Sequence, residues 1–154
     1  MTPLTGIDIV AAHESAHAVS AFIHGLKLVS VRVGEDDGRV VYELGDSRAV
    51  AVTSCCGCIA AHRICPCWQP GFGGPSAEDW RGILFDVADW NDLPGIEEEA
   101  IRLVGENWKL ILALADRLKE RRFMDGISVE RFLAFRLRGR GWNVVLRRKV
   151  SNNF

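Results

Sequence analysis

Two histidines stand four residues apart in a run of small, helix-forming residues, and this spacing constrains the fold more than any other feature of the chain. The run reads AAHESAHAVSAFIHG over residues 11–25. A helix is expected over Ile7–Ile23, because capping residues precede it, alanines fill it and a glycine follows it. Helical residues i and i+4 lie on the same face. His13 and His17 are therefore expected to present two imidazoles at one place.

The spacing His13-Glu14-Ser15-Ala16-His17 has the form HExxH, which is typical of zinc peptidases. Two imidazoles and a third protein ligand leave zinc one position for a water, whose pKa then falls to about 7. Glu14 is rotated about 100° from His13, so it can reach that water without coordinating the metal. Glu14 is the expected general base, and metal-assisted amide hydrolysis is the expected reaction class.

The third ligand does not follow from the motif itself. A metzincin would need glycine at position 20 and histidine at 23, where this chain has Ser20 and Ile23. His24 lies two turns beyond His17, about 10 Å along the axis, which is too far to share an ion. We therefore interpret His24 as a helix-end or surface residue.

The remaining pattern predicts a mainly α fold with one small β-hairpin or sheet. Apolar residues recur at helical spacing over Ile96–Glu120, which predicts one long amphipathic helix. The other expected elements are strands at 28–33 and 39–44, a helix over Ser47–Cys65, a helix opening at Ser76–Asp79 and running to about Asp89, and a short helix over Ser128–Leu137.

Length and composition indicate one soluble globular domain over residues 1–154. The chain has 48% hydrophobic and 25% charged residues and a formal net charge of −1. No apolar run approaches the roughly 20 residues of a membrane helix, and the N-terminus lacks a secretory signal pattern. We expect a cytoplasmic protein without a membrane partner.

Five cysteines lie between Cys55 and Cys67, and their odd number argues against a disulfide framework. Cys55, Cys58, His62 and Cys65 share one helical stripe, but the stripe is about 15 Å long and cannot surround one ion. Packing is the preferred interpretation, with only the Cys65-Pro66-Cys67 segment expected at the surface. A cysteine-based metal or redox role is the alternative.

In order along the chain, these motifs resemble the peptidase domain of the FtsH-type ATP-dependent zinc proteases over residues 6–127. HESAHAVSAF resembles that family's HEAGHA helix, CCGCIAAHR is similar to its GGRAAEE segment, GGPSAEDW to its TGASNDL segment, and residues 95–126 to its closing helix pair. The chain departs from the family at Ala16, His62 and Glu78, which replace glycine, glutamate and asparagine.

The resemblance implies that Asp79 is the third zinc ligand beside His13 and His17. Asp92, in the sequence WNDL, reproduces the family's ND dipeptide better and is the competing candidate. Placing the ligand at Asp92 would leave the GGPSAEDW segment unexplained, so Asp79 is preferred.

The expected function is therefore a zinc metalloendopeptidase that cleaves peptides or unfolded proteins, with the hairpin over residues 28–44 as an edge along which substrate binds. The family's ATPase and membrane segments have no counterpart in these residues, so a separate ATP-dependent unfoldase is an expected partner. The alternative is a catalytically silent, peptidase-like binding or adaptor module. The basic tail over residues 138–154 is interpreted as a solvated end or a homo-oligomer contact in preference to a nucleic-acid site.

Overall fold

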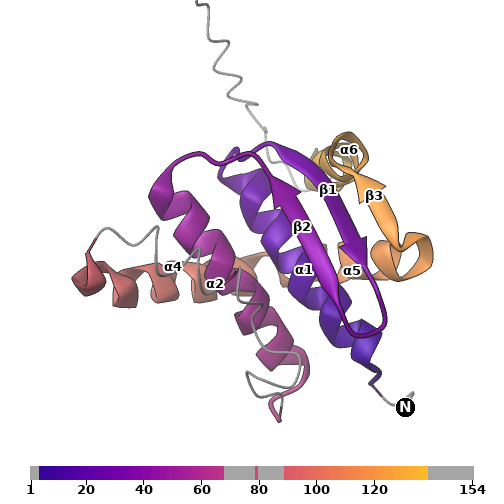
Figure 1. Ribbon diagram of the computed structural model, residues 1–154, viewed down its shortest axis with the longest axis horizontal. Helices are drawn as coiled ribbons and strands as arrows, with labels where there is room; N and C mark the ends of the chain where they lie inside the picture. The colour runs from indigo at the N-terminus through magenta and orange to yellow at the C-terminus, as the bar shows by residue number, and fades with distance from the viewer. Residues whose placement is uncertain (1–3, 68–78, 80–88, 139–154) are drawn as a thin grey trace, which may run out of the picture.

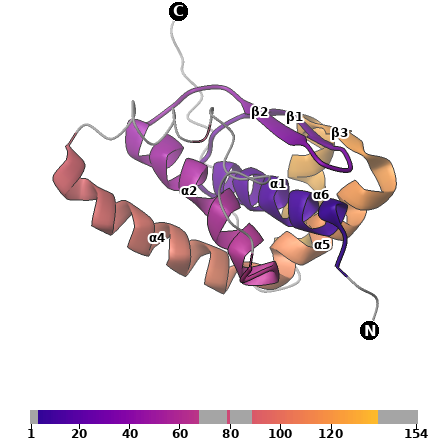
Figure 2. The same cartoon turned by 60° about the horizontal axis from the view of Figure 1, so that its bottom comes forward.

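The computed structural model describes residues 4–67, 79 and 89–138, and these residues form a mainly helical fold with a small antiparallel sheet. The predicted fold class is confirmed. The sheet, the helices over residues 6–23 and 47–64, and the helices over residues 93–106 and 108–121 form three successive layers (Figures 1 and 2). The predicted helix from residue 76 to about 89 and the tail beyond residue 138 lie outside the described residues, apart from the helical Asp79 and from Asp89.

Helix α1 (Gly6–Ile23) occupies the middle layer, between the sheet and α5 (Trp108–Arg121) (Figure 2). Its start is held by Asp8, whose carboxylate accepts hydrogen bonds from the Thr5 backbone N–H at 2.9 Å and from the Thr5 hydroxyl at 2.7 Å. Its end is followed by Gly25, with φ of 71°. Every residue from 11 to 21 is buried, and small side chains let neighbouring elements approach from several sides.

The sheet covers α1 with three strands in the order β2-β1-β3 (Figure 1). The strands are β1 (Leu28–Val33), β2 (Gly38–Tyr42) and β3 (Phe123–Asp125). The hairpin of β1 and β2 was predicted, whereas β3 was not. In β1, Val31 is fully buried; it pairs with Val40 on one side and Met124 on the other.

Helix α2 (Ser47–Ile64) packs along α1 in the middle layer (Figure 2). Asp46 caps its start by accepting a hydrogen bond from the Ala49 N–H at 2.9 Å. The helix ends one residue before the predicted limit, because Cys65 is extended and Pro66 cannot continue an α-helix.

The predicted single helix over Ile96–Glu120 is wrong, because the chain forms two helices there. They are α4 (Leu93–Glu106) and α5 (Trp108–Arg121), separated at Asn107. Asn107 is buried, and its side-chain amide donates to the Leu103 carbonyl at 2.9 Å. A side chain that bonds to its own helix competes with the backbone ladder, and asparagine is favoured at such ends.

Helix α6 (Gly126–Arg138) includes the predicted helix over Ser128–Leu137 and packs against β1. Its first residue lies so close to the Leu28 backbone that a Cβ there would overlap the Leu28 carbonyl carbon and oxygen. Glycine is therefore required at Gly126. None of the helices in the described residues combines the length and apolar character that crossing a bilayer requires.

Candidate metal centre

The two motif histidines point the same atom at the same place. Their Nε2 atoms lie 2.9 Å apart, and their ring centroids 4.6 Å apart with the planes nearly perpendicular. Both residues are buried, with 9% of His13 and 5% of His17 exposed. This is the arrangement expected from i, i+4 spacing on one helical face.

Asp79 closes the group from a distant part of the chain. Its Oδ2 lies 3.1 Å from His13 Nε2, and its Oδ1 lies 3.3 Å from His17 Nε2. One ligand atom from each of the three residues falls within 4.8 Å of the others. Two donor atoms on a tetrahedral zinc with bonds of about 2.0 to 2.1 Å are separated by about 3.3 Å. These three residues could hold one metal ion.

Helix α2 orients His17 through a backbone carbonyl. His17 Nδ1 lies 2.7 Å from the Thr53 oxygen, and because a carbonyl only accepts, Nδ1 carries the hydrogen. In the neutral imidazole this leaves the lone pair on Nε2, the nitrogen that would bind the ion. The Thr53 and Ser20 hydroxyls are bonded at 2.8 Å, which ties this part of α2 back to α1.

Gly57 leaves the space in which the two imidazoles stand. A Cβ built on Gly57 would lie 2.7 Å from His13 Nε2 and 2.6 Å from His17 Cε1, where ordinary contact begins at 3.4 Å. The backbone of α2 thus forms one wall of the candidate site. Gly57 belongs to the CCGCIAAHR segment that carries part of the resemblance, but the sequence did not predict its packing role.

Glu14 is buried beside the group, with 7% of its surface exposed. The hairpin covers it, since a Cβ on Gly38 would lie 2.7 Å from Glu14 Oε1 and 2.8 Å from Cδ. Burial raises the pKa of Glu14 to about 7. A carboxyl group with this pKa can take up and release a proton near neutral pH, as a general base must.

The charges of the group are strongly coupled in the metal-free protein. Burial lowers the pKa of His17, but the Asp79 carboxylate, the Glu14 charge and the Thr53 carbonyl outweigh it and raise that pKa to about 9. Burial and the charge of His17 lower the pKa of His13. Burial opposes ionisation of Asp79, yet its contacts with both histidines hold its pKa well below the usual range. The two histidines and the carboxylate therefore titrate as one coupled group.

The competing residues lie elsewhere. Asp92 is an exposed residue of η1 (Trp90–Asp92) and is not a member of the group. His24 caps the end of α1, where its Nδ1 donates to the Ser20 carbonyl at 2.9 Å and its Nε2 lies 3.5 Å from Glu99 Oε1. The structure thus joins Asp79 to the two motif histidines.

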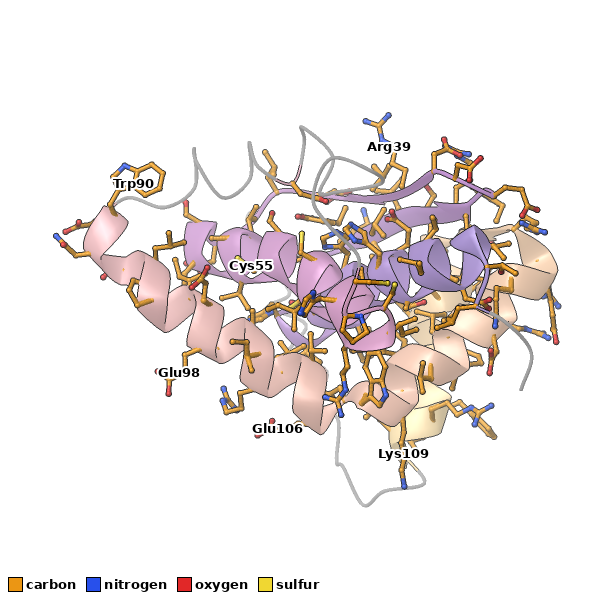
Figure 3. The ribbon with its side chains drawn as sticks, turned by 90° about the horizontal axis from the view of Figure 1, so that it is seen from below. Arg39, Cys55, Trp90, Glu98, Glu106 and Lys109 are labelled. Atoms are coloured by element: carbon orange, nitrogen blue, oxygen red, sulfur yellow. The ribbon has the colours of Figure 1, made fainter. Side chains whose placement is uncertain are left out.

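The cysteines divide into two sets. Cys55 and Cys56 are buried in α2 and Cys58 is partly buried, as the packing interpretation predicted (Figure 3 labels Cys55). Within the described residues, no cysteine belongs to a group of three or more candidate metal ligands. Cys65 and Cys67 follow α2, with Cys67 exposed and the two sulfurs 2.8 Å apart.

No protein-family model matches this chain, and no curated protein sequence matches it.

Proposed function

We propose that this chain is a zinc-dependent metallopeptidase that hydrolyses peptide bonds in extended peptides or unfolded proteins. The observation that carries the proposal is the meeting of His13, His17 and Asp79 around one point, with Glu14 buried beside them. Two imidazole nitrogens and one carboxylate oxygen form a donor set that zinc accepts in catalytic sites. The resemblance to FtsH-type peptidases supports the choice of zinc among divalent metals.

Zinc held there would supply Lewis acidity, which lets a water lose its proton near neutral pH. His13, His17 and Asp79 would hold the ion, and the Thr53 carbonyl would keep His17 in the tautomer that presents Nε2. A carboxylate oxygen of Glu14 would accept the proton from the attacking water and deliver it to the nitrogen of the leaving amine.

We propose that the substrate binds along the β1–β2 hairpin. The first residue of β2, Gly38, lies against Glu14, so a peptide running beside the hairpin would pass the general base. Recognition through the peptide backbone requires no particular side chains, which suits unfolded proteins of varied sequence. For folded substrates we propose that a separate ATP-dependent unfoldase delivers the chain.

The test combines metal analysis with hydrolysis of a permanently unfolded protein such as labelled casein. The informative variant is Glu14→Gln, and Glu98→Gln is its matched control, since Glu98 is exposed on α4 and points away from α2 (Figure 3). General acid–base catalysis typically contributes about 10² to 10⁴ in rate. Glu14→Gln should therefore bind zinc but cleave at least about 100-fold more slowly.

The wild-type protein and Glu98→Gln should both cleave, lose activity to a chelator and regain it with zinc. Cleavage that persists in Glu14→Gln would contradict the assigned mechanism. Zinc binding without cleavage of any extended substrate would instead favour the silent binding or adaptor module.

A further inference from the structure

A second pair of reactive side chains lies directly after α2, outside the proposed metal ligands. Cys65 ends the helix in an extended conformation, with its backbone N–H donating to the Ala61 carbonyl at 2.9 Å. Pro66 then separates it from Cys67. The two Sγ atoms lie 2.8 Å apart. The residue before a proline favours the extended region, so Pro66 helps to hold Cys65 in the conformation that brings the sulfurs together.

The five thiols differ in their access to solvent. Cys67 is exposed, Cys65 and Cys58 are partly buried, and Cys55 and Cys56 are buried. Burial raises the pKa of the Cys55 thiol to about 11 and of the Cys56 and Cys58 thiols to about 12. Reaction requires the thiolate and access to it, so the raised pKa of all three thiols, together with the burial of Cys55 and Cys56, protects them from oxidation.

We propose that Cys65 and Cys67 form a redox-active dithiol, which low-molecular-weight disulfides oxidise reversibly to an intramolecular disulfide. The sulfurs need to approach from 2.8 Å to about 2.05 Å, a movement of less than 1 Å.

The reaction balances by two thiol–disulfide exchanges. One sulfur of the pair, as its thiolate, attacks a sulfur of the small disulfide, forms a mixed disulfide and releases one small thiolate. The second sulfur of the pair then attacks the protein sulfur of that mixed disulfide, forms the Cys65–Cys67 bond and releases a second small thiolate. The protein dithiol loses two electrons and two protons, and the small disulfide becomes two thiols.

Ring size and exposure make this disulfide a switch and not a structural staple. The bond closes a loop of three residues, and short loops remove little entropy from the unfolded chain. Exposed disulfides are also the more easily reduced class. The Cys65 sulfur raises the pKa of the Cys67 thiol, so oxidation should accelerate as the pH rises.

The test treats the reduced full-length protein with oxidised glutathione, then blocks the remaining thiols and measures intact and peptide masses. The wild-type protein should lose two blockable thiols and carry a link between Cys65 and Cys67, and excess reduced glutathione should reverse it. Cys65→Ser and Cys67→Ser should each stop at a mixed disulfide with glutathione. Cys58→Ser is the matched control and should oxidise like the wild type.

An unmodified wild-type protein, a link through any of the three protected cysteines, or a purely intermolecular disulfide would each overturn the proposal. Circular dichroism of each variant separates loss of the dithiol from loss of the fold. The outcome is independent of zinc binding and of peptide hydrolysis, so the two proposals succeed or fail separately.

Discussion

Replacing Gly57 by alanine tests whether metal binding by the two histidines depends on the close approach of α2 to their imidazoles. The added methyl group would lie 2.6 Å from His17 Cε1 and 2.7 Å from His13 Nε2, and ordinary contact begins at 3.4 Å. The His13 ring must therefore move away by about 0.7 Å and the His17 ring, whose Nε2 is nearer still, by more than that, unless the helix beneath them moves instead. Metal–ligand distances tolerate only about 0.2 Å.

We expect Gly57→Ala to weaken zinc binding by about 100-fold, which corresponds to about 2.8 kcal/mol. That is the upper end of the effect of losing an outer partner of a metal ligand, about 10- to 100-fold. Metal-free stability should change less. The gain in helix propensity, roughly 0.5 to 1 kcal/mol, is set against an overpacking cost of about 1 to 3 kcal/mol.

The assay is competition for zinc against a chelator of known affinity, together with thermal unfolding of the metal-free proteins. Gly105→Ala is the matched control, because Gly105 lies in α4 and the nearest atom to its Cβ would be an Arg63 guanidinium nitrogen at 3.8 Å. The control should bind zinc like the wild type. A folded Gly57→Ala protein with wild-type affinity would refute the reasoning.

Four further predictions concern the same site. Because the pKa of His17 is raised to about 9, zinc must displace a proton at neutral pH, so affinity should rise about tenfold per pH unit between pH 7 and 8, and a pH-independent affinity in chelator competition would contradict this. In the metal-free protein, protonated His17 stabilises the folded state. This contribution is complete below the unfolded imidazole's pKa of about 6.5 and is lost as the pH rises through about 9. The melting temperature of chelator-treated protein should therefore fall over this range. Asp79→Asn should weaken zinc binding by at least about 10-fold, because even the loss of a hydrogen-bond partner of a metal ligand has an effect of that size. Asp92→Asn, at the competing aspartate, should leave zinc binding unchanged. The reverse result in metal titrations would make Asp92 the third ligand. In Gly38→Ala the added methyl group would contact Glu14, so kcat should fall by roughly 10- to 100-fold while zinc affinity is retained. Equal losses of kcat, measured by kinetics, and of zinc affinity, measured by metal titration, would show that the residue supports the whole site.

Local spacing made part of the site predictable, and distant packing did not. The four-residue repeat of His13 and His17 determines that the imidazoles share a face, since this follows from helix geometry alone. Asp79 is 62 positions further along the chain, and only the resemblance selected it over Asp92. Gly57 and Gly38 are needed because a side chain at either position would overlap a residue of the site. That overlap depends on how α2 and the hairpin pack against α1, which local sequence does not reveal.

The same division applies to the fold. The sequence did not predict the helix boundary at Asn107, because the helical spacing of apolar residues continues across it. Val104 and Ile111, one on each side of the boundary, are both fully buried. Strand β3 was missed because three residues carry no readable alternation. Its existence depends on pairing with β1, and such non-local pairing overrides local preference.

The pairing of β1 with β3 also sets an order for folding. Ser30 pairs with Asp125, so the sheet joins the first fifth of the chain to its last fifth. On a ribosome, every proposed zinc ligand would emerge before the strand that completes the sheet over α1. In the nascent chain, Val31 would lack its β3 neighbour until Met124 has been synthesised. The loop between β1 and β3 is long, so its closure is entropically costly and is expected late in folding. Completion of the sheet over α1 is therefore expected to be a late step of folding.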